Sequence, residues 1–205
     1  SGVAATPTNG ATSSAAGMGF DSQSEYVELT PFELGGTFSM ETFVTVDYVS
    51  GRFFHAKDTT DDSNSFQLGR YSNDRLLFYD AAGGYQYTSA NYYVEDVFVH
   101  IVMTVTNNTD VVFYKNGGNP ESLTLANGIS SVTRDNMRLG NMVYSDDNGR
   151  RVQDGTMTHF RIWQGTALSA SDVARLYDAR NVKTTQLNFH VNNQLSLAVT
   201  DNGLA

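Results

Sequence analysis

The fold is decided by the stretch DGTMTHFRIWQGTALSASDVARLYDAR, which runs from Asp154 to Arg180. In its first half, the apolar Phe160 and Ile162 flank the polar Arg161. This alternation is typical of a β-strand with one buried face. Gln164-Gly165 interrupts the pattern with a turn signal. The stretch therefore predicts a half-buried strand that ends in a tight turn.

A short capped helix is predicted directly after that turn. Ser169 is followed three residues later by Asp172, which is the spacing of a capping box. In such a box the hydroxyl and the carboxylate satisfy backbone N–H groups that lack a helical partner. Val173, Leu176 and Tyr177 then share one helical face. We expect this face to pack on the preceding strands.

The order of strand, turn, A-L-S and helix resembles the closing segment of laminin-G-like and pentraxin-like domains, which are concanavalin A-like sandwiches. TFSMETFVTVDYV, residues 37–49, resembles the F-T-I-E-x-W-V strand of this family, with Phe43 in place of Trp. VEDVFVHIVMTVT, residues 94–106, resembles its W-x-H-I-A-V-T strand, with Phe98 in place of Trp. The resemblance implies a two-sheet antiparallel jelly-roll sandwich, all-β except for one short helix in the C-terminal third.

Length and composition are consistent with one large β domain. The chain has 205 residues, and its 12 Phe and 11 Tyr can fill a sizeable core. Residues 1–17 are rich in Ala, Thr, Ser and Gly, which predicts a flexible arm or linker before a sandwich domain of residues 18–205. TTQLNFHV and QLSLAV near the C-terminus predict two further strands, the last of which is expected to return to the sheet beside the first strand.

The charge of the chain excludes some classes of partner. Its formal net charge is −9, whereas nucleic-acid binding needs a basic surface. No apolar run approaches the length of a membrane span, so membrane insertion is not expected. An acidic surface suits a secreted domain or one that collects divalent cations. The family resemblance likewise implies an extracellular or surface-exposed location.

Two acidic loops are candidates for a calcium site. The first is DTTDDSN, Asp58 to Asn64, and the second is YSDDNG, Tyr144 to Gly149. Carboxylate and amide oxygens are the ligands that Ca²⁺ prefers. The resemblance to pentraxin-like domains implies that both loops contribute, although the family's acidic L-G-Q-E-Q-D run reads LGNMVY here. The candidate metal ligands are Asp61, Asp62, Asn64, Asp146 and Asp147. Plain solvated turns remain the alternative, because Asp and Asn are common in turns.

A cluster of tyrosines, in AAGGYQYTSANYY, is the candidate carbohydrate site. Exposed aromatic rings stack on the apolar faces of sugars, and the Tyr hydroxyl adds a polar contact. We expect Tyr85 and Tyr92 to be the stacking rings, with Asp62 and Asn64 as polar ligand-binding residues. Strand periodicity instead favours the core for Tyr87 and Tyr93.

Signatures of catalysis are weak. The β-glucanase relatives place carboxylates as E-x-D-x-x-E on one strand, whereas Glu41 and Asp47 have the wrong spacing. His100 lies in a predicted buried strand, which favours a packed structural histidine over an acid–base role. The main hypothesis is a non-catalytic, calcium-assisted recognition or adhesion module for carbohydrate or glycoprotein within a larger surface or secreted protein. A structural or self-associating surface module, including one of a virion, and a polysaccharide-degrading enzyme are the alternatives.

Overall fold

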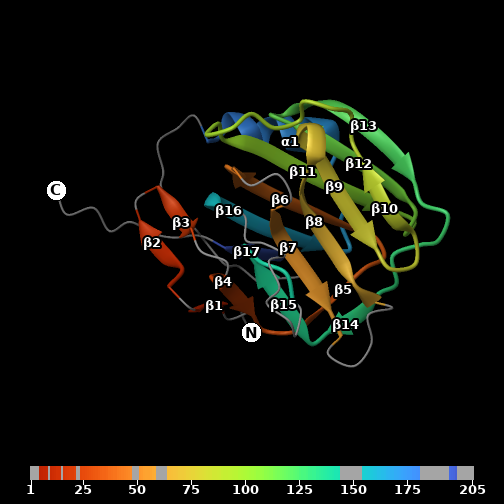
Figure 1. Cartoon of the computed structure of the whole chain (residues 1–205). Coiled ribbons are helices and arrows are strands. Elements are labelled where there is room, and N and C mark those ends of the chain that lie inside the picture. The colour runs from red at the N-terminus through yellow and green to blue at the C-terminus, as the bar shows by residue number, and fades with distance from the viewer. Residues whose placement is uncertain are drawn as a thin grey trace.

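Two large antiparallel sheets pack face to face in the computed structural model (Figure 1). The structure describes residues 5–8, 10–14, 16–21, 24–47, 51–58, 64–143 and 154–180, and the strand at Gln194–Leu197. The predicted all-β jelly-roll sandwich with one helix is confirmed. The predicted turn is also confirmed, because the long strand β16 ends at Gln164 and Gly165 follows with a φ of 76°.

The first sheet has seven strands, and four of them form a continuous meander from β7 to β10. Its order is β1 (Ala5–Thr8), β4 (Tyr26–Leu29), β15 (Asn136–Leu139), β7 (Arg52–Lys57), β8 (Phe66–Tyr71), β9 (Arg75–Asp80) and β10 (Gly84–Tyr87). A 3₁₀ turn at Ser72–Asp74 joins β8 to β9.

The second sheet has eight strands. Its order is β13 (Gly118–Thr124), β12 (Asp110–Lys115), β11 (Val99–Thr106), β6 (Phe38–Val44), β16 (Gly155–Gln164), β3 (Gly17–Phe20) and β2 (Thr12–Ser14), and β17 (Gln194–Leu197) also pairs with β16. A separate pair is formed by β5 (Phe32–Leu34) and β14 (Val132–Arg134).

Phenylalanine rings from both sheets form the centre of the core. Phe54 of β7 lies 5.2 Å from Phe160 of β16, measured between ring centroids. Phe78 of β9 meets Phe113 of β12 at 6.2 Å across the same interface. All four rings are fully buried. Because strand residues alternate between faces, these contacts fix which side of each strand points outward.

Helix α1 (Ala170–Asp178) covers the outer side of the second sheet (Figure 1). The predicted capping box is confirmed, because the Asp172 N–H donates to Ser169 Oγ and the Ser169 N–H donates to the Asp172 carboxylate. Val173 is buried in a small apolar cluster with Val102 of β11 and Tyr114 of β12. The helix thus buries the one face that its sequence makes apolar.

The two ends of the chain contribute strands at the sheet edges. Residues Ala5–Thr8 pair with β4, and Thr12–Ser14 pair with β3, which differs from the flexible arm predicted for residues 1–17. Backbone pairing explains the difference, since an edge strand needs no apolar side chains to be held; the residues of β2 are all exposed. At the other end β17 returns to the sheet as predicted, but it pairs with β16 rather than with the first strand. The other predicted C-terminal strand lies outside the described residues.

Candidate functional site

Aromatic side chains gather on the outer side of the first sheet, at its β8–β9–β10 edge. Tyr79 of β9 lies directly opposite Tyr85 of β10. Tyr71 of β8 lies opposite Arg75 of β9. Tyr87 is two residues after Tyr85, so both rings are on the same face of β10. We call the surface made by Tyr71, Arg75, Tyr79, Tyr85 and Tyr87 the aromatic surface.

The rings of the aromatic surface form a continuous row. The centroids of Tyr79 and Tyr85 are 4.6 Å apart, and those of Tyr71 and Tyr87 are 4.8 Å apart. Tyr85 links the two pairs, because its ring lies 6.3 Å from Tyr87 and nearly parallel to it, at 8°. Tyr85 is 52% exposed, while the other three rings are partly buried. Four rings in van der Waals range of one another hold a fixed platform for a ligand.

The aromatic surface offers both apolar faces and polar groups. Burial, together with the neighbouring Tyr71 and Tyr85, raises the pKa of the Tyr87 phenol. Its hydroxyl therefore stays neutral at physiological pH and can donate a hydrogen bond. The guanidinium of Arg75 lies over the Tyr87 ring, with Cζ 4.6 Å from the centroid. Such a combination can stack on a sugar ring and bind its hydroxyl groups.

The structure corrects two predictions about the tyrosines. Tyr92 was expected to be an exposed stacking ring, but it is 5% exposed. The backbone N–H groups of Tyr92 and Tyr93 both donate to the Asp74 carbonyl, which ties this loop to the turn between β8 and β9 and places both rings in the core. Tyr87 was expected in the core but shares the outer face with Tyr85, because residues two apart on a strand point the same way. Tyr93 is buried as predicted.

Most of the candidate calcium ligands, namely Asp61, Asp62, Asp146 and Asp147, lie outside the described residues. Asn64 closes the first acidic loop, because its Nδ2 donates to Asp58 Oδ2 at 2.7 Å. Arg134 Nε donates to the Asn64 carbonyl. Within the ranges that the structure describes, no group of three or more His, Asp or Glu side chains could hold a metal.

His55 of β7 joins the flanks of the two acidic loops. Its Nδ1 accepts a 2.7 Å hydrogen bond from the backbone N–H of Val143, which comes just before the second loop. Its Nε2 lies 2.9 Å from the Ser65 hydroxyl, just after the first loop. Burial lowers the pKa of His55 to about 3, so the imidazole stays neutral and Nδ1 can accept at pH 7. The sequence suggested no role for His55, and the structure shows that it contacts the residue after the first loop and the residue before the second.

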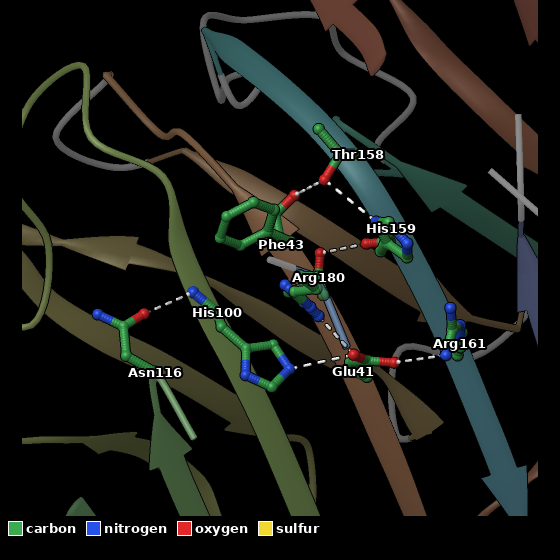
Figure 2. A network of polar contacts seen from close by, with 9 residues as sticks. Glu41, Phe43, His100, Asn116, Thr158, His159, Arg161 and Arg180 are labelled. Atoms are coloured by element: carbon green, nitrogen blue, oxygen red, sulfur yellow. Dashed lines mark hydrogen bonds and ion pairs between the residues drawn. The ribbon is translucent and has the colours of Figure 1, made fainter. Parts of the chain in front are cut away.

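A second polar cluster lies on the outer side of the second sheet, against helix α1. Figure 2 shows its residues. Its centre is Glu41 of β6, which is 1% exposed. Glu41 Oε1 accepts from Arg180 Nη2 and, at 3.1 Å, from His100 Nε2. Glu41 Oε2 lies 3.5 Å from Arg161 Nη1 on the neighbouring strand β16. We call these four residues the Glu41 network.

Glu41 stays ionised inside the fold because His100 and two arginines surround it. Burial raises the pKa of Glu41, but the His100 hydrogen bond and the two arginines outweigh it and lower this pKa to about 2. Burial also lowers the pKa of His100, which is therefore neutral at pH 7. His159 lies beside the network, and its Nδ1 shares a 3.3 Å hydrogen bond with the Thr158 hydroxyl. Burial lowers the pKa of the His159 imidazole to about 4. One carboxylate thus faces two guanidinium groups.

The Glu41 network holds the helix on the sheet. Arg180 lies two residues after the end of α1, and its guanidinium lies 4.5 Å from the centroid of Phe43 on β6. His100 stacks on Tyr177 of the helix, with ring centroids 5.6 Å apart. His100 is fully buried, as predicted for a packed histidine. Glu41 and His100 are buried, and their contacts with Arg180 and Tyr177 tie the helix to the sheet.

Sequence reasoning missed the partners of Glu41. Arg180 is 139 positions away in the chain, and no local pattern connects the two. One signal was available, because β6 carries Glu41 and Phe43 on the face opposite its core residues. Phe43 stacks on Phe98 at 4.9 Å, and these are the two positions where the family strands have Trp. A strand that is buried on both faces needs a covering layer, which the helix supplies.

The fold is a lectin-like jelly-roll sandwich of two packed antiparallel sheets. One sheet carries a helix on its outer side, and the other carries an exposed aromatic row. The family model that matches the sequence, over residues 21–174, is that of the concanavalin A-like lectin/glucanases superfamily. The chain belongs to this family, which confirms the resemblance. A comparison with curated protein sequences gave no match. No helix in the described part of the chain is long and apolar enough to cross a membrane.

Solved structures with the same fold come from several kinds of protein. Domain 4 of AbnA, an extracellular arabinanase of Geobacillus stearothermophilus in complex with arabinotriose, is 17% identical with a TM-score of 0.64, and the match covers 85% of this chain and 87% of that one. The receptor-binding domain of botulinum neurotoxin C/D mosaic serotype is 11% identical, with a TM-score of 0.64 and coverage of 91% and 48%. Trypanosoma rangeli sialidase in complex with sialic acid is 13% identical, with a TM-score of 0.64 and coverage of 85% and 29%. The chain thus spans only part of the toxin domain and of the sialidase, and these likenesses show the fold alone.

Proposed function

We propose that this protein is a non-catalytic recognition module that binds carbohydrate, free or on a glycoprotein, through the aromatic surface. The observation that carries the proposal is the row of four tyrosine rings around the 52% exposed Tyr85. A contiguous aromatic patch at a protein surface often marks a ligand-binding site, and a preformed row of rings matches the flat apolar faces of consecutive sugars.

The position of the aromatic surface supports the same function. It lies on paired strands rather than on a free loop, so the rings keep their places before a ligand arrives. The structural neighbours include a domain solved with arabinotriose, which is consistent with sugar binding on this fold. The Glu41 network, by contrast, is sealed under α1, so a polysaccharide-degrading activity receives no support from it.

Tyr85→Ala is expected to weaken glycan binding by on the order of 1–3 kcal/mol, as the loss of an aromatic anchor does. The melting temperature should stay nearly unchanged, because the ring is half exposed. The measurement is calorimetric titration with a glycan first identified on an array with the parent protein. Tyr85→Phe should keep most of the affinity, since it retains the ring and removes only the hydroxyl.

Val94→Ala is the matched control for that experiment. It removes apolar surface from a side chain that is 59% exposed and lies outside the aromatic surface, so binding should not change. Full affinity in Tyr85→Ala would remove the aromatic surface from the binding site. Binding to no glycan at all would favour the structural or self-associating alternative.

We further propose that calcium assists this recognition, at a site formed by the two acidic loops. The support comes from their flanks: Asp58 and Asn64 are joined by a hydrogen bond, and His55 holds Ser65 and Val143 together. Asp61, Asp62 and Asn64 would supply oxygens from one loop, and Asp146 and Asp147 from the other. Calcium would then link the two loops beside the sheet face that binds the ligand. A location at the cell surface or outside the cell, within a larger protein, is part of the same proposal.

Calcium is expected to raise the melting temperature, because a ligand that binds only the folded state stabilises it by mass action. At a concentration about 100-fold above the dissociation constant, the rise should be roughly 5–10 °C for a chain of this size. Melting curves in calcium, magnesium and chelator make the measurement. Identical curves in calcium and chelator would contradict the site, and a rise that survives Asp146→Ala with Asp147→Ala would move the metal elsewhere.

A further inference from the structure

Arg75 is the charged member of the aromatic surface, and its guanidinium lies among rings. Its Cζ is 4.6 Å from the Tyr87 centroid and 5.7 Å from the Tyr71 centroid, and its Nε donates to the Ser72 carbonyl at 3.4 Å. No Asp or Glu in the described part of the chain forms an ion pair with it. Other arginines do have carboxylate partners: Arg70 pairs with Asp74, and Arg175 with Asp172.

The outer side of the first sheet is basic from β15 to β10, although Glu28 of β4 lies opposite Arg138 on the same side. Arg138 of β15, His55, Gln67, Tyr79 and Tyr85 lie opposite one another in a single row across five strands, so they share this side. Lys57 of β7 faces the same way, two residues after His55. On β15 and on β7 to β10, the outward positions hold Arg138, Lys57 and Arg75 but no Asp or Glu. This contrasts with a chain whose net charge is −9.

We propose that the ligand of the aromatic surface is an anionic glycan, whose carboxylate or sulfate groups pair with Arg75 while an adjacent sugar ring lies on Tyr85. This inference rests on the proposed carbohydrate binding and specifies its ligand class. A guanidinium presents a planar fork of N–H donors that matches carboxylate and sulfate oxygens. Its stacking on Tyr87 and Tyr71 holds the fork in place, so little side-chain freedom is lost when an anion binds.

The charge distribution restricts the binding of an anionic glycan to this side of the first sheet. The acidic remainder of the surface repels a polyanion, while the basic sheet face attracts it, and the two effects together favour one orientation of the ligand. A neutral glycan can still stack on Tyr85 but leaves the Arg75 guanidinium facing water. Arg75 therefore determines specificity, whereas Tyr85 supplies affinity common to both ligand types.

The test compares glycans that differ only in charge. One pair is oligogalacturonate and its methyl-esterified form, which carry carboxylate and neutral ester groups on the same sugar chain. The other is a sulfated galactan oligosaccharide and its desulfated form, so the two pairs distinguish carboxylate from sulfate. We expect the charged member of at least one pair to bind about tenfold or more tightly than its neutral partner. Arg75→Gln should remove most of that difference, because it weakens binding of the charged member far more than binding of the neutral member.

Arg75→Lys should keep part of the preference, because it retains the charge without the planar fork. Arg175→Gln is the control, since it removes one positive charge from exposed helix surface on the other layer of the sandwich. Equal affinities for charged and neutral members, with binding that still depends on Tyr85, would overturn the anionic ligand and leave carbohydrate binding intact. Unchanged preference in Arg75→Gln would also overturn it. Binding to neither member of either pair, with no other glycan bound on an array, would overturn both proposals.

Discussion

Glu41→Gln is expected to lower the free energy of unfolding by about 3–5 kcal/mol, which is the range for removing one partner of a buried ion pair. The loss follows from what remains, because Arg180 would be buried beside a neutral amide after the carboxylate that accepts from it is gone. Arg161 is less affected, since its side chain is 27% exposed and water can solvate it. Urea denaturation followed by circular dichroism measures the difference.

Glu28→Gln is the control, because it removes the same charge from an exposed position. Its effect should stay within about 0.5 kcal/mol. The double variant Glu41→Gln with Arg180→Gln should regain part of the loss, since it leaves no unpaired buried charge. A denaturation midpoint that is the same in Glu41→Gln and the parent protein would contradict the role of the Glu41 network.

The same network predicts a pH dependence with a definite sign. The pKa of Glu41 is lowered from 4.5 to about 2 in the folded protein, so folding favours the ionised form. Its stabilising contribution is complete above pH 4.5 and is lost as the pH falls toward 2. The stability difference between the parent protein and Glu41→Gln should therefore shrink over this window. A difference that is constant with pH would contradict the lowered pKa.

Phe160→Ala is expected to cost about 3–5 kcal/mol of stability, as other truncations of large buried aromatics do. Phe160 is fully buried on β16, and its ring lies 5.2 Å from Phe54 of the opposite sheet. Removing it leaves a cavity between the sheets that neighbouring rings cannot fill. Phe160→Leu should cost less, because most of the volume remains. An unchanged midpoint in Phe160→Ala would mean that the ring is not in the core.

Local patterns in the sequence were sufficient for strand β16 and helix α1. The alternation around Phe160 and the capping box at Ser169 are each contained within a few neighbouring residues, and both elements form where they were predicted. Their arrangement in two sheets came from the family resemblance rather than from periodicity. The edge strand Thr12–Ser14 was missed because backbone pairing holds it, and its side chains give no apolar signal.

The candidate site was only partly predictable, because it depends on which residues meet across strands. Tyr85 was found from its type and its loop-like surroundings. Its partners Tyr71 and Tyr79 come from β8 and β9, and their positions follow from strand registers that the sequence does not specify. Tyr92 was predicted to be an exposed binding residue but is buried. The backbone hydrogen bonds of Tyr92 and Tyr93 to Asp74 place its ring in the core.

The most direct test of carbohydrate recognition is a crystal structure of this protein with the glycan that binds it most tightly, grown in calcium. We expect a sugar ring to lie flat against Tyr85, with an anionic group within hydrogen-bonding distance of the Arg75 guanidinium. The rings of Tyr71, Tyr79 and Tyr87 should keep the positions that they have here. A glycan bound elsewhere, with Tyr85 left exposed to solvent, would contradict the proposed site.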